Sequence, residues 1–413
     1  MYLKSINEDE TALVAPPVCA PCERRAFSRK QLAVAGIFAG IGGLEKGFRD
    51  KGHESLLLCE ADERARQVLA SQFPRVRLVE DVRELGGLPN CDVLTAGFPC
   101  QDLSQVGRRQ GISGPNSGLI DVVLSLLERA RPGPAWVVLE NVPFMLSLDG
   151  GRAIERIVTK LEDMGFAWAY RTVDARAFGL PQRRRRVVIL ASRVADPRPA
   201  LLGVDAAAPQ VGKRGVHACG FYWTEGNTGL GWAVDSTPPL KGGSGLHIPS
   251  PPAIWFPRRR LIAVPSIEDA ERLQGFDAGW TYADGEDPRR TRQRWRLVGN
   301  AVSVPFAGWI ADRLSSSDGY NTDGDHAPEA GVRWPDAAWG VDGRRGRSSV
   351  SQWPVVAAQQ HLASFLKHKV RPLSRQATAG FLLRLERSSL RYEKAFRLDL
   401  HHHVKQHDAH DAR

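Results

Sequence analysis

The sequence predicts an α/β protein with a doubly wound, mostly parallel sheet, followed by a smaller loop-rich domain. Two observations predict the sheet. Short apolar runs recur between residues 32 and 192, and amphipathic stretches with apolar residues three and four positions apart separate them. A third observation predicts the second domain, because Gly, Pro and aromatic residues replace this alternation between residues 193 and 265.

The elements follow in order along the chain. The expected strands are the apolar runs at residues 32–38, 55–60, 76–81, 92–98, 135–141, 168–173 and 186–191. The helices expected between them are residues 63–73, 118–130 and 151–165, whose apolar side chains share one face. Beyond the loop-rich region we expect helical segments at 266–276 and 377–390, and an apolar stretch at 294–314 that suits packing back onto the sheet.

Composition narrows the function classes. The chain has 413 residues and a net charge of +10, which favours an acidic partner. No apolar run approaches the roughly 18 residues of a membrane helix, and the first residues are too polar for a signal peptide, so we expect a cytoplasmic protein without a membrane partner. The six scattered cysteines argue against a disulfide framework, so a functional cysteine is expected to be a free thiol.

Ligands of open α/β sheets bind beyond the carboxyl ends of the strands, so the residues after each strand are informative. Gly40, Gly42 and Gly43 follow the first strand in a turn that lets the backbone approach a ligand, although many plain turns are also glycine-rich. Glu60 ends the second strand at the spacing where a carboxylate meets ribose hydroxyls. Asp81 ends the third strand, where it either accepts from an adenine amino group or caps a helix. Together these residues indicate an adenosine-type cofactor.

Two further strand ends suggest covalent chemistry. Cys100 follows Pro99 in a polar turn after the fourth strand, and a thiol near positive charge can have its pKa pulled below the free value of about 8.5. Glu140 ends the fifth strand after an apolar run, where burial would raise the carboxyl pKa and let it donate a proton. A nucleophile and an acid are therefore expected at the same edge of the sheet.

An arginine-rich segment precedes the seventh strand. If it is extended, Gln182, Arg184 and Arg186 point to one side of the sheet, and Arg183 and Arg185 point to the other. We expect the first set to serve the site and the second to be solvated or to contact phosphate.

Taken in order, these motifs resemble the conserved blocks of the DNA (cytosine-5) methyltransferases of bacterial restriction–modification systems. Each motif alone is common by chance, whereas the ordered set is specific. The resemblance covers about residues 34–318 and rests on FAGIGG (38–43), Glu60, Asp81, Pro99-Cys100-Gln101, Glu140-Asn141-Val142, Gln182/Arg184/Arg186, AERLQGF (270–276) and GNAV (299–302). It implies the S-adenosylmethionine-dependent methyltransferase fold, S-adenosylmethionine as methyl donor, no metal, and a cytosine flipped out of duplex DNA as acceptor.

The resemblance also implies residue roles. Cys100 would add to C6 of cytosine, Glu140 would hold or protonate N3, and Arg184 and Arg186 would orient the base and the catalytic loop. The implied cofactor contacts are Phe38, Gly40, Gly42, Gly43, Glu60, Asp81, Pro99 and Asn300. The implied substrate contacts are Gln101, Ser104, Gln182, Lys241, Gly242, Gly243 and Arg272. Two departures, Gly36 before the turn and Ala61 where some members have an aromatic, affect expected cofactor affinity more than activity.

The resemblance divides the chain. The expected parts are an N-terminal tail (1–31), a catalytic domain (32–192), a target-recognition domain (193–293), a segment packing back on the catalytic domain (294–318) and a C-terminal extension without assigned chemistry (319–413). A monomer is expected to act on a short, palindromic, G·C-rich duplex sequence, with GCCGGC as one candidate. The candidate guanine readers, each more often a phosphate contact, are Arg214, Lys241 and Arg258 to Arg260. A cognate restriction endonuclease is implied genetically, not as a physical partner.

Alternatives remain open from the residues. An amino-methyltransferase would use Ser250-Pro251-Pro252, but Ala253 follows where an aromatic is expected. An RNA methyltransferase of the same family would carry a Cys-Phe-Thr triplet, which is missing from the sequence. A catalytically silent DNA-binding scaffold is disfavoured by Cys100 and Glu140. A zinc module from Cys19-x-x-Cys22 and the terminal histidines lacks a four-ligand pattern, so we expect both segments to be flexible tails.

Overall fold

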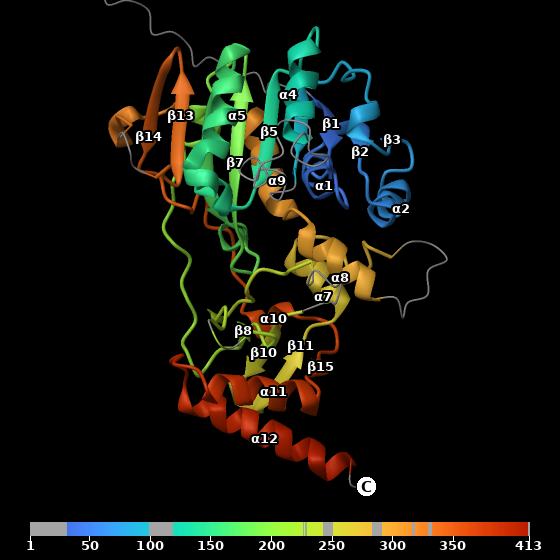
Figure 1. The fold of residues 1–413 in the computed structure, drawn as a ribbon, viewed down its shortest axis with the longest axis vertical. Helices are drawn as coiled ribbons and strands as arrows, with labels where there is room; N and C mark the ends of the chain where they lie inside the picture. The colour runs from blue at the N-terminus through green and yellow to red at the C-terminus, as the bar shows by residue number, and fades with distance from the viewer. Residues whose placement is uncertain are drawn as a thin grey trace, which may run out of the picture. The chain divides into compact units, whose positions relative to one another are not determined.

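A computed structural model of the chain describes residues 31–98, 119–225, 227, 229–242, 251–282, 291–315, 319–328 and 333–411. These residues belong to one compact unit, Gln31–Arg413, which contains a larger and a smaller sheet (Figure 1). The predicted N-terminal tail, with Cys19 and Cys22, lies almost wholly outside the described residues. No helix in the described ranges is both long enough and apolar enough to cross a membrane.

Ten strands form the larger sheet within the described residues, in the order β12-β14-β13-β6-β7-β5-β4-β1-β2-β3. Parallel pairing joins β1 to β2 and β4, β2 to β3, and β4 to β5, while β7 runs antiparallel between β5 and β6. The predicted doubly wound, mostly parallel sheet is confirmed. Its strands are β1 (Ala33–Ile37), β2 (Glu54–Cys59), β3 (Arg77–Val79), β4 (Val93–Ala96), β5 (Trp136–Asn141), β6 (Ala167–Asp174), β7 (Arg185–Ser192), β12 (Asp325–His326), β13 (Ala337–Val341) and β14 (Arg344–Ser348).

Helices cover both faces of this sheet because alternate residues of each strand point to opposite sides. On one face Leu94 and Val137 pack with α4 (Leu119–Arg129) and α5 (Arg152–Asp163), which Figure 1 shows crossing the strands. On the other face Val93 and Val138 pack with α1 (Gly43–Arg49), α6 (Arg198–Leu201) and α9 (Val304–Ser315). Helix α2 (Glu63–Gln72) joins a further core beside α7 (Ile267–Leu273) and α8 (Thr291–Asn300).

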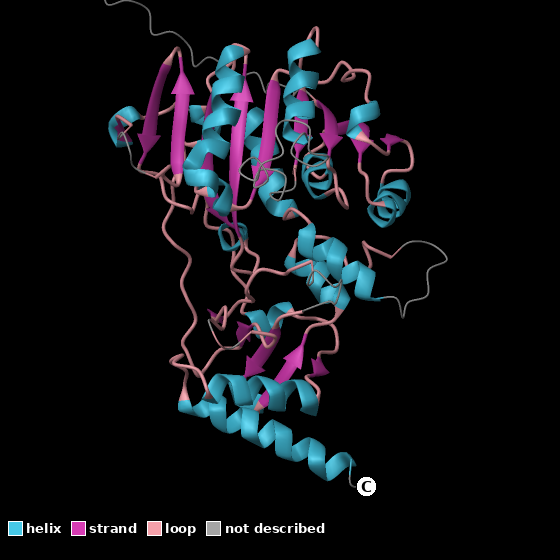
Figure 2. Cartoon of the chain, viewed as in Figure 1, coloured by secondary structure: helices cyan, strands magenta, loops and turns pink. Residues whose placement is uncertain are grey.

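The region predicted to be loop-rich contains a sheet of its own. Its antiparallel strands have the order β15-β11-β10-β8-β9. Phe221 and Trp255 of this sheet pack against Phe381 of α11 (Arg375–Glu386) and Phe396 of α12 (Lys394–Asp411), and Figure 2 shows the two helices alongside the strands. The strands are β8 (Cys219–Phe221), β9 (Ala233–Val234), β10 (Ala253–Phe256), β11 (Leu261–Val264) and β15 (Arg371–Pro372).

The C-terminal extension therefore belongs to both sheets. Strands β12 to β14 lengthen the larger sheet past β6, whereas β15, α10 (Leu362–Phe365), α11 and α12 complete the smaller one. The expectation of a flexible histidine-rich tail is wrong for the described residues 401–411, which lie in α12. His403 is buried there, and its Nε2 lies 2.8 Å from the carbonyl oxygen of Leu373.

A buried acid replaces the side chain that Gly36 lacks. A Cβ at Gly36 would lie 2.3 Å from Oε1 of Glu45, so the carboxyl group of Glu45 fills the space under β1. Thr95 donates a hydrogen bond to that oxygen at 2.8 Å, while Oε2 has no hydrogen-bond partner among the described residues. Burial, together with the nearby charge of Glu60, raises the pKa of Glu45 to about 7, although the hydrogen bond from Thr95 opposes the shift.

We expect Glu45→Gln to stabilise the protein at pH 8 and to change its stability little at pH 4.5. Because the pKa of Glu45 is raised in the folded state, this group stabilises the fold below pH 4.5. The stabilisation is lost as the pH rises through about 7, since the folded protein must then bury a carboxylate that has no cation beside it. A shift of this size corresponds to about 3 kcal/mol of unfolding free energy. Urea unfolding at both pH values measures it, with the exposed Glu54→Gln as control; equal effects at both pH values would contradict the assignment.

Candidate active site

A cavity of about 790 Å³ opens at the carboxyl ends of β1, β2, β4 and β5, where the sequence places the site. Its volume lies within the range typical of small-molecule sites. The predicted residues that line it are Phe38, Gly40, Glu60, Asp81, Glu140, Arg186 and Asn300. The predicted Pro99, Cys100, Gln101, Ser104 and Gly243 lie outside the described residues. Phe98 and Leu119, which flank residues 99–118, both line the cavity.

The turn after β1 leaves the backbone open to the cavity. Gly40 has a φ of +57°, and a Cβ there would meet no atom within 4 Å. Phe38 also has a positive φ, 54°, a conformation that side chains rarely adopt outside functional sites. Gly42 and Gly43 are required by close packing. Added Cβ atoms there would lie 2.6 Å from the Phe73 ring and 2.4 Å from the Val302 carbonyl oxygen, and neither glycine lines the cavity.

Two carboxylates face the cavity beside this turn. Glu60 accepts hydrogen bonds from the amides of Gly40 at 2.7 Å and Asp62 at 2.8 Å, which fix its orientation. Burial raises the pKa of Glu60, and the two amides oppose that shift. Asp81 accepts from the amide of Arg83 and pairs with its guanidinium, which lowers the pKa of Asp81. Asp81 thus begins a 3-10 turn, as the capping alternative predicts, and still lines the cavity.

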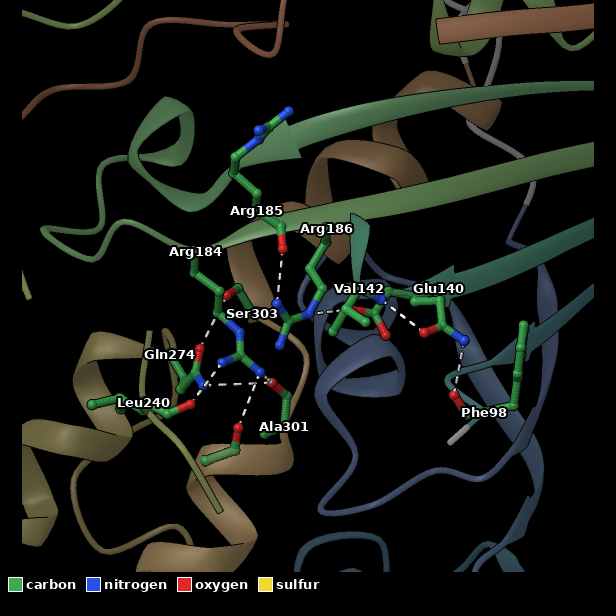
Figure 3. Close-up of polar contacts among 12 residues, drawn as sticks. Phe98, Glu140, Val142, Arg184, Arg185, Arg186, Leu240, Gln274, Ala301 and Ser303 are labelled. Carbon is green, nitrogen blue, oxygen red and sulfur yellow. Dashed lines mark hydrogen bonds and ion pairs between the residues drawn. The ribbon is translucent and has the colours of Figure 1, made fainter. Parts of the chain in front are cut away.

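Glu140 and Arg186 form an ion pair at the opposite part of the same cavity. Nε of Arg186 lies 2.8 Å from Oε1 of Glu140, and the two side chains point toward each other in Figure 3. Burial raises the pKa of Glu140, whereas the guanidinium groups of Arg186 and Arg184 oppose that shift. A carboxyl group that is buried and held by one cation can keep or give a proton near neutral pH.

Asn141 positions the chain that leads to Cys100, a role that the sequence argument did not assign. Its Nδ2 donates to the carbonyl oxygen of Phe98 at 3.1 Å, and its Oδ1 accepts from the amide of Val142 at 2.8 Å. Asn141 therefore ties the end of β5 to the residue after β4. The signal was present in the Glu-Asn-Val motif, since an amide side chain can donate and accept at once.

Arg184 holds the segments that surround the cavity. Its buried guanidinium donates to the carbonyl oxygens of Leu240 at 3.0 Å, Gly299 at 3.1 Å and Ala301 at 2.7 Å (Figure 3). The segment that contains Leu240 and the end of α8 are thereby joined to the start of β7. Arg184 acts as a positioning residue, because its side chain contacts these carbonyls and does not line the cavity.

Gln182, a predicted substrate contact, is held by internal hydrogen bonds and does not line the cavity. It is fully buried; its Nε2 donates to the carbonyl oxygen of Leu273 at 2.8 Å, and its Oε1 accepts from the amide of Leu240 at 3.0 Å. The alternation of the segment is confirmed nevertheless. Arg185 points away from Arg184 in Figure 3 and pairs with Asp336 at 2.8 Å.

The remaining predicted substrate contacts have different surroundings. Lys241 pairs with Glu225 and lies 3.7 Å from the centre of the Tyr222 ring. Gly242 packs on the cavity residue Asn300, since a Cβ there would lie 2.3 Å from Oδ1 of the asparagine.

Arg272, another predicted substrate contact, interacts with the C-terminal extension. It pairs with Asp269 at 2.9 Å, donates to the carbonyl oxygen of Phe365 and covers the ring of Phe365. It therefore anchors the C-terminal extension instead of facing the cavity.

The comparisons with known proteins agree with this geometry. Residues 32–204 match the family described as C-5 cytosine-specific DNA methylase. Type II methyltransferase M2.BsuMI of Bacillus subtilis (strain 168) is 43% identical over 377 residues, which cover 88% of this chain and 96% of that protein. Type II methyltransferase M.MspI of Moraxella sp is 31% identical over 312 residues, 71% of this chain and 72% of that protein.

A solved structure supports the fold. The crystal structure of the S. pombe Dnmt2 methyltransferase matches with a TM-score of 0.54 at 15% identity and covers 69% of this chain and 98% of that chain. The sequence similarity extends further along the chain than the family match alone and includes most of M2.BsuMI. The chain belongs to the C-5 cytosine-specific DNA methylase family.

Proposed function

We propose that this DNA cytosine-5 methyltransferase modifies one cytosine within a specific short duplex sequence and thereby protects that sequence from a cognate restriction endonuclease. The observation that carries the proposal is the single cavity that contains both the Glu60 carboxylate and the Glu140–Arg186 pair. A methyl donor and a flipped base would share this volume. The similarity to two type II methyltransferases supports the restriction–modification context.

The family implies S-adenosylmethionine as the donor, and the residues present fit it. Glu60 keeps lone pairs for the ribose hydroxyls after accepting two amides, since a carboxylate offers about four acceptor sites. Ile41, Val82 and Leu119 give the cavity apolar walls that suit an adenine ring. When bound, S-adenosylmethionine supplies an electrophilic methyl group.

The protein side chains would prepare the cytosine for this methyl group. The Cys100 thiolate forms a bond to C6, and the C5–C6 double-bond electrons become a nucleophile at C5. Glu140 holds a proton at N3, which neutralises the negative charge that the addition creates, and Arg186 keeps Glu140 in place. After C5 is methylated, loss of its proton restores the double bond and expels the thiolate.

The finer features of the substrate follow from the resemblance. We infer a palindromic, G·C-rich site, with GCCGGC as one candidate, read by a monomer in the cytoplasm without physical contact to the endonuclease. Gly242, which packs on the cavity residue Asn300, and Lys241 beside it would lie near the flipped base. The rival amino-methyltransferase motif is disfavoured by position, because Pro251 and Pro252 precede β10 of the smaller sheet and do not line the cavity.

We expect DNA affinity to fall steeply with salt. The net charge of +10 and the exposed Arg183 favour phosphate contacts, and each contact releases a counterion. With about six contacts, affinity would drop roughly 10³-fold between 50 and 200 mM salt. Fluorescence anisotropy with a labelled duplex measures the slope, and Arg183→Ala should reduce it by about one unit. A flat response would contradict the electrostatic argument.

Bisulfite sequencing of plasmid DNA from a methylation-free host that expresses the chain tests the proposal. Protected cytosines within one recurring short sequence would support it and identify the site. Uniform conversion, in cells where the folded protein is present, would overturn it in favour of the amino-methyltransferase or the silent scaffold. A digest of the same plasmid to nucleosides separates those two, because only the former leaves a methylated amino group.

A further inference from the structure

Three side chains from distant parts of the chain meet outside the cavity. His217 precedes β8, Asp235 follows β9, and His361 begins α10 in the C-terminal extension. One ligand atom of each lies within 4.8 Å of the ligand atoms of the other two. None of the three residues lines the cavity of the active site, so they form a separate cluster.

The contacts of the cluster hold the carboxylate of Asp235 against His361, whose ring stacks on His217. Oδ2 of Asp235 lies 2.5 Å from Nδ1 of His361, while Oδ1 accepts from the amide of Leu362 at 2.9 Å. The rings of His217 and His361 stack with their centres 4.6 Å apart and their planes inclined by 28°. Backbone atoms of Lys213 hold the Nδ1 side of His217, at 2.8 Å from the amide nitrogen and 3.3 Å from the carbonyl oxygen.

The backbone is shaped to present the carboxylate. Asp235 has a φ of +51°, in the left-handed region that side chains rarely adopt unless the surrounding structure imposes it. Gly212 makes room for it, since a Cβ at Gly212 would lie 2.6 Å from the Cβ of Asp235. Backbone hydrogen bonds that orient ligating side chains are the usual surroundings of a metal in proteins.

The combination of two imidazoles and one carboxylate suits a bound metal ion. Two protonated rings stacked beside a single carboxylate would repel each other, whereas two neutral imidazoles and one carboxylate are the ligand set that zinc accepts. Tetrahedral ligands of zinc lie about 3.4 Å apart. The His361 side chain, which is 62% exposed, can move the roughly 1 Å that this spacing requires.

We propose that His217, Asp235 and His361 bind one zinc ion, with water in the fourth position, and that this ion fastens the C-terminal extension to the target-recognition sheet. The ligands come from the recognition region on one side and from α10 on the other. The site does not open into the active-site cavity, so the ion would join the two segments and would not take part in methyl transfer. This inference does not depend on the substrate proposed above.

The test uses the full chain without a histidine tag, stripped with EDTA and titrated with zinc chloride against a chromogenic chelator. We expect one tightly bound zinc per chain by elemental analysis. His361→Ala should weaken binding at least tenfold and abolish the zinc-dependent rise in the unfolding temperature. The exposed position of His361 lets this variant fold, and His401→Ala, in α12, is the matched control.

Two outcomes would overturn the proposal. One is a wild-type chain that binds no stoichiometric zinc under these conditions. The other is a zinc that His361→Ala retains but that Cys19→Ser removes, which would assign the ion to the N-terminal cysteine pair.

Discussion

Replacing Cys100 by alanine is expected to abolish methyl transfer, with a rate loss of roughly 10⁴-fold or more, while DNA binding stays measurable. Without the thiolate there is no bond to C6, and C5 of cytosine remains too electron-poor to take a methyl group. The contacts to phosphate and to the flipped base come from other residues, so the affinity for duplex DNA should change little.

Transfer of labelled methyl groups to DNA measures this effect. The matched control is Cys91→Ala, because Cys91 is buried away from the cavity and burial raises the pKa of its thiol to about 11, which keeps it unreactive.

A second test uses DNA with fluorine at C5. With fluorine in place of hydrogen, C5 has no proton to lose after methyl transfer, and the thiolate cannot be expelled. The wild-type chain should therefore stay covalently attached to the DNA. Turnover by Cys100→Ala would rule out the covalent mechanism.

Glu140→Gln should lower the rate of the chemical step by about 10² to 10⁴-fold, the contribution typical of a positioned acid, and weaken DNA binding far less. Glutamine keeps the shape of the side chain but cannot hold a transferable proton. It also leaves the partly buried cation of Arg186 without its carboxylate, so Arg186 is expected to lose its fixed position.

The pH profile separates these two effects. Burial raises the pKa of Glu140, so the acid form persists to higher pH than in an exposed carboxyl group, and activity that needs this form declines as the pH rises through that pKa. This decline in activity with rising pH should be missing in Glu140→Gln and remain in the control Glu128→Gln, whose side chain is exposed. If the variant changed only KM, Glu140 would have a binding role and the proposed proton transfer would be wrong.

The larger sheet could be predicted because its strands are buried on both faces. Runs such as AVAGI and WVVL are apolar throughout, and each predicted strand matches an observed one to within two residues at either end. The stretch 294–314 proved to be two helices. Pro305 occupies the second position of α9, where a proline fits because the first turn of a helix does not use its backbone N–H groups, so α9 begins at Val304 and the chain between the helices reaches the cavity.

The strands missed by the sequence argument depend on partners that are far away in the chain. Strand β15 consists of Arg371 and Pro372, and β14 reads RRGRS, so neither has an apolar run to signal it. Their backbone groups pair with β11 and with β13 and β12, respectively. Local patterns carry no information about such pairing.

The sequence could place Glu60 and Glu140 at the cavity, because each side chain comes from the end of a single strand. The sequence could not predict the side chains that hydrogen-bond to backbone groups far away in the chain. Arg184 and Gln182 lie on the expected side of their strand, yet their partners are 56 to 117 residues away. The His217, Asp235 and His361 cluster was missed for the same reason, since 126 positions separate Asp235 from His361.

The sharing of the C-terminal extension between the two sheets limits how this enzyme can be re-engineered. A chimaera that exchanges only residues 193–293, the expected target-recognition domain, would inherit a sheet without its edge strand β15 and without the helices that bury Phe221 and Trp255. The donor must also provide residues 361–411, while β13 must stay with the host because it pairs with the host's β6. Exchange of the smaller sheet therefore needs two matched inserts, which require at least three crossovers.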